Sequence, residues 1–246
     1  MFKQLKASLG IGATTVDTLV ENESLYQGEM LRGVVRIKGG NIEQQIEAIS
    51  LKLCTEVKVE SDSGVSYESF VLGSMQVNDP FVVQPDEEKD VAFELKLHDE
   101  TPITAVNARS NKCHVWLETT LDIDFAIDPS DRDFIEVRPL PVVQRVLNTL
   151  EREGFTMVKA DVEKGQLNGD GFTSLSGCYQ ELEFKSSGMF NRKEIELSFI
   201  LDGNVIHCLA EIDRSFGRGD MFRSFTISLD ASEGEVEQAL ASTLHA

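Results

Sequence analysis

The sequence is short of basic residues and of long apolar runs, and each shortage disfavours a class of protein. Its 246 residues include 23 Lys and Arg against 42 Asp and Glu, a formal net charge of −19. Because binding to nucleic acids and anionic membranes relies on clustered Lys and Arg, neither partner is expected. No apolar run approaches a membrane span, and the N-terminal segment lacks the continuous apolar region of a secretory signal peptide.

Cysteine is also scarce, and no two cysteines form a CxxC pair. The four are Cys54, Cys113, Cys178 and Cys208. Separated thiols are typical of a reducing compartment, so we expect a cytoplasmic protein. Two thiols have an imidazole neighbour, in Cys113-His114 and His207-Cys208. Neighbours on a strand point to opposite faces, and the close ligand spacing of a zinc site is missing. We therefore predict no metal site and no cofactor.

Familiar catalytic and phosphate-binding motifs are missing too. The sequence contains neither a GxSxG nucleophile elbow nor a GxxxxGK[ST] phosphate loop. Arg218-Gly219-Asp220 spells an adhesion tripeptide, but in a cytoplasmic protein we interpret it as a Gly-rich loop between strands. The sequence therefore predicts a protein that is not an enzyme.

What the first half has in abundance is alternation of apolar and polar residues, which is typical of antiparallel strands with one wet face. Ile46 is out of step with the row that begins at Ile49, so we expect a β-bulge near Glu47-Ala48. Several such strands separated by turns predict a β-sandwich. The expected inner rows are Leu31, Gly33, Val35 and Ile37; Ile49, Leu51, Leu53, Thr55, Val57 and Val59; Val91, Phe93, Leu95 and Leu97; and Cys113, Val115, Leu117, Leu121, Ile123 and Phe125.

The pattern changes between residues 127 and 154. Residues 128–133 have the composition of a turn, 134–137 of a short strand, and Pro139 and Pro141 restrict the backbone that follows. A helix is then expected, with Pro141 in its first turn and Gly154 just past its end. Its apolar stripe consists of Val142, Val143, Val146, Leu147 and Leu150.

The second half returns to alternating strands and finishes with a helix over about 233–244. A length of 246 residues suits two domains of ordinary size, each able to bury a core. We therefore predict an all-β protein of two tandem β-sandwich domains, 1–138 and 139–246, with a short helix after the junction and a C-terminal helix. One large sandwich is the alternative architecture.

Several segments resemble the bacterial sporulation-control protein family, which has an arrestin-like fold. They are GIGATTVDT (10–18), QGEMLRGVVRIKGG followed by QQIEAISLKL (27–53), IDPSDRDFIEVRPLPVVQRVL (127–147) and EIDR (211–214). The resemblance implies two tandem arrestin-like sandwiches, no catalysis, and regulation through protein contacts. Gln27 departs from it, because arrestin-like chains often have proline there.

Charged residues gather where the two domains are expected to meet: Asp128, Asp131, Arg132, Asp133, Arg138, Asp213 and Arg214. They are open to two interpretations. As exposed turn residues, their ion pairs would contribute roughly 0 to 1 kcal/mol each. By analogy with the polar core of arrestins, they would instead form an interdomain polar network that fixes how the domains are oriented.

The predicted function is that of a cytoplasmic regulator or adaptor for a protein partner, contacted through exposed sheet edges or the interdomain groove. Edge pairing between subunits would give a homo-oligomer. Trp116 points away from the predicted inner row, where a loop or the second domain could cover it or where it serves as an exposed contact residue. The alternative function is small-molecule binding or hydrolysis in an interdomain cleft. A third possible function is membrane recruitment through Phe2, Leu5 and Leu9.

Overall fold

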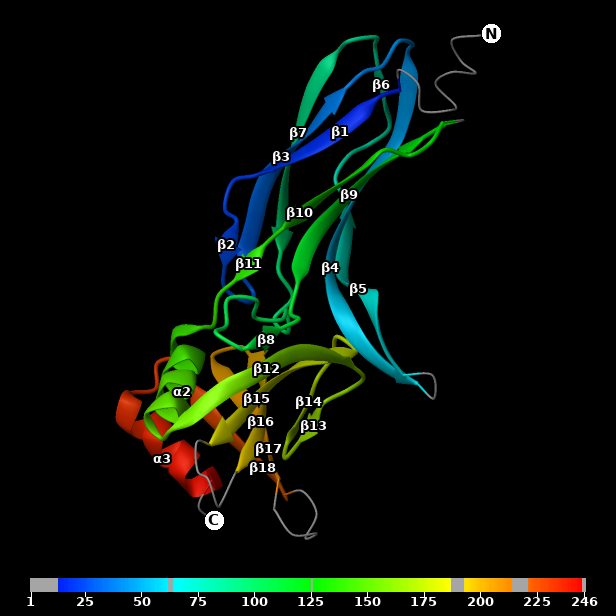
Figure 1. The fold of residues 1–246 in the computed structure, drawn as a ribbon. Coiled ribbons are helices and arrows are strands. Elements are labelled where there is room, and N and C mark those ends of the chain that lie inside the picture. The colour runs from blue at the N-terminus through cyan, green and yellow to red at the C-terminus, as the bar shows by residue number, and fades with distance from the viewer. Residues whose placement is uncertain (1–12, 62–63, 125, 187–192, 214–220, 245–246) are drawn as a thin grey trace.

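The computed structural model describes residues 13–61, 64–124, 126–186, 193–213 and 221–244. The chain is mostly β and forms two lobes stacked end to end (Figure 1). We call residues up to Val137 the N-terminal lobe and residues from Pro141 the C-terminal lobe. Residues 2–9, Phe125 and 218–220, which carried three of the expectations above, lie outside the described ranges.

Two facing sheets build the N-terminal lobe. One is the antiparallel sheet β1 (Thr15–Val20), β3 (Met30–Lys38) and β7 (Glu88–Lys96). In the other, β4 (Gln44–Ser61) has β9 (Val115–Ile123) and then β10 (Ser130–Phe134) on one side, and β5 (Gly64–Gln76) and β6 (Phe81–Val83) on the other. A short parallel pair, β2 (Ser24–Leu25) and β11 (Glu136–Val137), lies nearer the C-terminal lobe.

The core of this lobe lies between the sheets, along the inner rows that alternation predicted. Leu31, Val35 and Ile37 are fully buried, as are Ile49 and Leu51 on the facing strand. The pairing of β4 with β9 shifts register between Ile46 and Ala48, which confirms the expected bulge. At the end of β3, Gly39 is so close to the backbone of Gln84 that a Cβ would overlap its carbonyl oxygen.

The C-terminal lobe is one antiparallel sheet with helices on one face (Figure 1). Its strand order is β12 (Phe155–Lys164), β15 (Cys178–Ser186), β16 (Glu194–Asp202), β17 (Val205–Asp213) and β18 (Met221–Ser228), with a small hairpin of β13 (Asn168–Gly169) and β14 (Phe172–Thr173). Helices α2 (Pro141–Arg152) and α3 (Glu233–Leu244) contact each other, β12 and β18.

This lobe differs from the predicted second sandwich, because helices form the second layer over its core in the described residues. The reason lies in the stripe of α2: Val142, Val143 and Val146 are fully buried and supply the apolar surface that another sheet would provide. Helix α2 has Pro141 in its first turn and is followed by Gly154 at φ +86°, as expected. Its neighbour α3 buries Val236 and Leu240.

The two lobes share a sheet, because β4 and β12 pair in parallel at Lys58 and Glu163. Strand β8 (Ser110–Asn111) also pairs with β12. Buried apolar side chains of both lobes form one connected cluster, so the interface is packed as well as hydrogen-bonded. No helix in the described ranges is long and apolar enough to cross a membrane.

Candidate functional site at the interface between the lobes

The acids of segment 128–133, candidates for the interdomain polar network, make their contacts within the N-terminal lobe instead. Residues 130–134, expected as turn and short strand, form β10 and pair with β9 inside the N-terminal lobe. The Asp131 carboxylate accepts a hydrogen bond from the backbone N–H of Thr18 at 2.7 Å, and Asp128 accepts one from Ile123 at 3.1 Å. These acids therefore fasten β10 and its turn to their own lobe.

The remaining members of that set also make local contacts. Arg132 lies 3.5 Å from the Glu118 carboxylate, and the guanidinium of Arg138 stacks 4.5 Å from the ring of Tyr26. Burial, together with the adjacent Asp131, raises the pKa of Asp133 to about 6. On the other lobe, Asp213 is exposed and faces Glu194 on β16, and Arg214 lies outside the described residues.

Trp116 is buried, contrary to its prediction as an exposed contact residue, with 5% of its surface exposed. It does point away from the inner row, as alternation predicted, but neighbouring strands cover it. The Arg132 guanidinium lies 4.8 Å from its ring and Phe134 6.2 Å, both from β10. In its place, Phe134 is 62% exposed at the edge of the sheet.

Polar contacts between the lobes involve a different set of residues, beginning with Lys58 on β4. Its ammonium donates a hydrogen bond to Glu163 on β12 at 2.8 Å, and only 15% of each side chain is exposed. It also lies 2.6 Å from Glu60. Burial alone would lower the pKa of Lys58, but the hydrogen bonds to Glu163 and Glu60 outweigh it and raise that pKa. Lys58 is therefore protonated at neutral pH.

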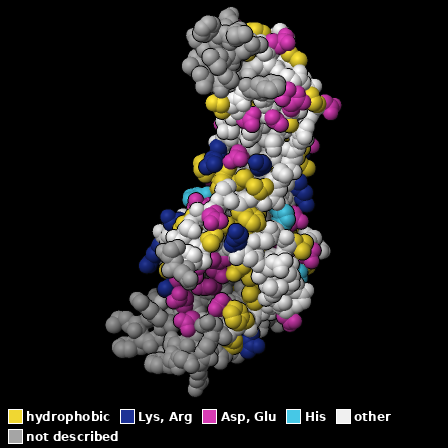
Figure 2. Space-filling model, turned by 90° about the vertical axis from the view of Figure 1, so that its right-hand side faces the viewer, with side chains coloured by type: hydrophobic (Ala, Val, Ile, Leu, Met, Phe, Trp, Pro, Cys, Tyr) yellow, Lys and Arg dark blue, Asp and Glu magenta, His cyan; other side chains and the backbone are white. Residues whose placement is uncertain are grey.

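Glu163 belongs to a group of carboxylates on the sheet face opposite the helices, which we call the acidic face. The acidic face consists of Asp161, Glu163, Glu181, Glu183, Glu194, Glu196 and Glu211. Directly opposed strand positions repeat the same charge, as in Asp161 with Glu181 and Glu196 with Glu211. Like charges opposed in this way destabilise a sheet. Acidic side chains gather over the C-terminal lobe on the side turned toward the viewer in Figure 2.

Burial and the neighbouring carboxylates together raise the pKa of two of these groups. Burial is the main cause for Glu181, whose pKa rises to about 8, with Glu196 and Glu163 adding repulsion. Burial again comes first for Glu196, and its neighbour Glu211 second, and together they raise its pKa to about 7. Both groups therefore change protonation near neutral pH.

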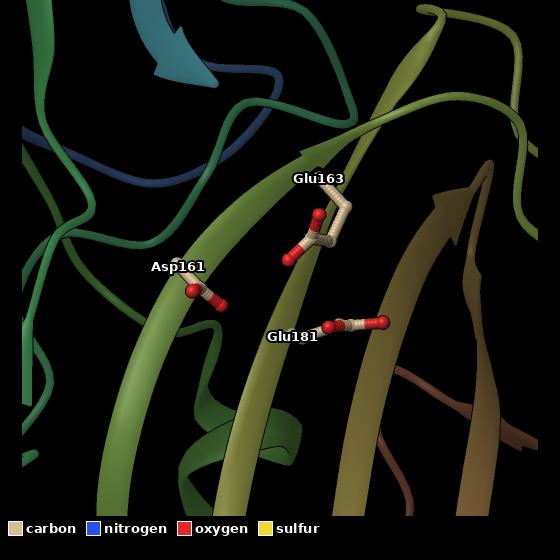
Figure 3. A group of neighbouring side chains, drawn as sticks. All are labelled: Asp161, Glu163 and Glu181. Atoms are coloured by element: carbon tan, nitrogen blue, oxygen red, sulfur yellow. The ribbon is translucent and has the colours of Figure 1, made fainter. Parts of the chain in front are cut away.

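Three of these carboxylates, Asp161, Glu163 and Glu181, lie close enough together to share a metal ion (Figure 3). Lysines already engage two of them, because Lys159 pairs with the buried Asp161 and Lys58 with Glu163. Only Glu181 is left for a cation, and burial favours its neutral form. This arrangement fits a lysine–carboxylate network better than a metal centre.

The cysteines behave as buried thiols. All four are free and buried, and burial raises the pKa of Cys113 to about 12 and that of Cys208 well above its ordinary value. The side-chain groups in the described ranges that could hold a metal contain neither cysteine nor histidine. These thiols therefore pack as apolar groups at neutral pH.

The side-chain amide of Gln180 on β15 makes a second link between the lobes. Its oxygen accepts a hydrogen bond from the backbone N–H of Ile103 at 3.0 Å, and its nitrogen donates to the Ile103 carbonyl at 2.7 Å. The same nitrogen lies 3.0 Å from the Cys113 sulfur. One glutamine thus pairs with the backbone of the opposite lobe as a strand would.

Glu100 makes a third link, at the edge of a cavity of about 430 Å³ between the lobes. Its buried carboxylate accepts hydrogen bonds from the backbone N–H groups of Leu175 and Ser176, both at 2.7 Å. On the far wall, the Phe172 ring stacks on His207 with 4.8 Å between centroids. Leu175, which also lines the cavity, is 84% exposed.

Sequence reasoning missed these linking residues because nothing local distinguishes them. Lys58 occupies an ordinary outward position on a long alternating strand, and its partner Glu163 is 105 residues away. Glu100 and Gln180 are single polar residues whose partners are backbone groups of the other lobe. Covariation between two positions in an alignment of related sequences is the signal that could find such pairs.

Comparison with known proteins gives a consistent result. Residues 2–216 match the family model described as SpoOM protein. The chain is 36% identical over 216 residues to the sporulation-control protein Spo0M of Bacillus subtilis (strain 168), covering 87% of this chain and 80% of that protein. The crystal structure of Spo0M from Bacillus subtilis superposes with a TM-score of 0.82 at 31% identity, over 94% of this chain and 98% of the other. This chain therefore belongs to the SpoOM protein family of sporulation-control proteins.

Proposed function

We propose that this protein is a non-enzymatic cytoplasmic regulator that works as an adaptor, binding a protein partner at the groove between its lobes. The observation that carries the proposal is the 430 Å³ cavity with walls from both lobes and the 84% exposed Leu175 beside it. An exposed leucine beside a groove suits an apolar side chain of a partner protein. The name of the related sporulation-control protein adds support for a regulatory role.

The polar groups around this cavity support binding over catalysis. Each has a partner within the protein: Glu100 holds two backbone N–H groups, Lys96 lies 3.1 Å from Asp99, and His207 shares a hydrogen bond with Thr226 at 2.8 Å. A catalytic site instead needs groups that converge on a point where a substrate atom can sit. The small-molecule or hydrolytic alternative therefore has less support.

The protein is further proposed to have an arrestin-like N-terminal domain and to reside in the cytoplasm. The N-terminal lobe, with its two facing sheets, is proposed to be the arrestin-like sandwich, and the C-terminal lobe a second domain whose helices stand in for one sheet of the tandem pair. Residence in the cytoplasm is supported by four free, buried cysteines, as expected where disulfides do not form.

Affinity purification of the full chain from its native host, with partners identified by mass spectrometry, tests the proposal. Leu175→Asp is the test variant, and Leu19→Asp, at a leucine 40% exposed on β1, is the matched control. We expect one partner to co-purify with the wild type and the control and to be lost with Leu175→Asp. Equal recovery with both variants, or no partner with any of the three proteins, would count against an adaptor that uses this groove.

A further inference from the structure

Strand β5 is a long sheet edge that the described part of the chain leaves open. It pairs with β4 along one side and with no other described strand, and it lies on the outer side of β4 in Figure 1. Its 13 residues span about 43 Å at the usual rise of a strand. The free side of such a strand presents unpaired backbone N–H and C=O groups, which are a template for another strand.

The chemistry of this edge differs from that of the chain as a whole. Charged residues make up 26% of the sequence, yet Glu68 is the single charged residue among the 13 of β5, and no proline interrupts it. Glu68 itself lies 3.8 Å from Lys164 of the C-terminal lobe. Three apolar side chains are exposed along the strand, Val65 by 57%, Tyr67 by 39% and Val71 by 48%.

Other long sheet edges in the described ranges are protected. Strand β1 has one charged residue among six, but it contacts β10, whose Asp131 accepts a hydrogen bond from the backbone N–H of Thr18. Strand β7 has five charged residues among nine, and β10 has three among five. Such charges prevent edge-to-edge association. Strand β18 has one, Arg223, but it is shorter, contacts helix α3, and its Ser224 hydroxyl accepts a hydrogen bond from the backbone of Asp170 at 3.2 Å. The contrast indicates that β5 is left open for association.

We propose that β5 pairs with β5 of a second copy of this chain, as antiparallel strands about a twofold axis, so that the protein is a homodimer. A twofold axis brings the same surface of both subunits together, and an antiparallel strand pair satisfies that symmetry. The exposed row of Val65, Tyr67 and Val71 lies on one face of β5, opposite Glu60, Lys58 and Cys54 of β4. Pairing would join the rows of both copies into one apolar strip.

Charge distinguishes a second copy from a basic peptide as the occupant. Two copies each carrying a net charge of −19 repel one another, so they can approach best where charge is absent. A site for a basic peptide would instead carry free acidic side chains, and the single one here faces Lys164. The homodimer is therefore expected to tighten as added salt screens the repulsion, whereas binding of a basic peptide would weaken. This homodimer goes beyond the proposed adaptor function and does not depend on it.

Sedimentation equilibrium of the purified full chain, over a range of protein and salt concentrations, tests the proposal. We expect a monomer–dimer equilibrium that tightens with added sodium chloride. Val71→Lys and Tyr67→Lys place two like charges at a twofold interface, so each should raise the dissociation constant at least about tenfold. Val82→Lys is the matched control, at a valine 41% exposed on β6, and should leave it unchanged.

Circular dichroism melts of each variant report folding separately, so a variant that unfolds is replaced by the other lysine variant. A wild type that remains monomeric at every concentration, or a dimer that both β5 variants leave intact, would overturn the proposal. So would a dimer that Val82→Lys weakens as much as Val71→Lys does. Open-ended growth into higher oligomers would exclude the twofold arrangement.

Discussion

Lys58 and Glu163 are 105 residues apart in sequence, and their side chains meet at 2.8 Å where the two lobes share a sheet. Both are largely buried, so each charge has lost most of its hydration. The opposite charge of its partner compensates for that loss. Removing one partner of such a pair leaves the other charge poorly solvated. The stability of the lobe interface is therefore sensitive to either residue.

Replacing Lys58 by methionine should lower the free energy of unfolding by about 1 to 3 kcal/mol, below the roughly 3–5 kcal/mol of a fully buried pair because some solvent still reaches it. Urea unfolding measures the change. Lys164→Met is the control, since its pair with Glu68 is exposed and should contribute at most about 1 kcal/mol. The double variant Lys58→Met, Glu163→Met should recover part of the loss, and a double variant less stable than Lys58→Met would contradict this account.

The acidic face should make the protein less stable as pH rises. Glu181 has an ordinary pKa of 4.5 and a pKa of about 8 in the fold. Between these values the folded state binds more protons than the unfolded state, so stability falls with increasing pH across that window. Glu196, with a pKa of about 7, acts in the same direction.

Thermal melts from about pH 5 to about pH 9 check this slope. Glu181→Gln should flatten it by an amount on the order of 1 to 2 kcal/mol across the window. Glu151→Gln, on the exposed side of α2, is the control and should keep the wild-type slope. An unchanged slope in Glu181→Gln would show that another group titrates there.

Glu100→Ala should loosen the segment that contains Leu175. The carboxylate holds two backbone N–H groups of the other lobe, and leaving these part-buried donors without an acceptor costs about 1 kcal/mol, the lower end of the range for buried groups. Hydrogen exchange at the amides of Leu175 and Ser176 should become faster. Glu100→Gln keeps one acceptor oxygen, so its effect should be smaller, and equal protection in wild type and Glu100→Ala would refute the role assigned to this residue.

Gly39→Ala should destabilise the N-terminal lobe, because the new methyl group would overlap the carbonyl oxygen of Gln84. Forcing one extra carbon into a packed site costs about 1 to 3 kcal/mol. Gly73→Ala on β5 is the control, as no atom lies within 4 Å of a Cβ there. Denaturant midpoints compare the two variants, and a loss of equal size in both would rule out the steric explanation.

Strands and helices were predictable wherever burial follows a local period. The rows of β3, β4 and β9, the bulge after Ile46 and the stripe of α2 were all visible in the sequence, because each depends on residues a few positions apart. The second layer of the C-terminal lobe was not, since a strand pattern does not specify whether a helix or a sheet covers it.

Contacts of charged and aromatic side chains were less predictable, because partners come from distant strands. The direction of Trp116 was correct, but its burial depends on Arg132 and Phe134 of β10. Asp131 was a candidate for an interdomain network, and instead its carboxylate accepts a hydrogen bond from the backbone N–H of Thr18 on β1, 113 residues away. Register between strands decides such contacts, and alternation alone does not fix it.

Strand β4 has a double membership: it pairs with β9 over Ile46–Thr55 and touches β12 at Lys58, near its other end. One continuous strand thus belongs to the sheet of the N-terminal lobe and also pairs with the first strand of the C-terminal lobe. Any tilt between the lobes must bend or shear β4. Strain that a bound partner introduces in one lobe is therefore transmitted to the other lobe through this strand.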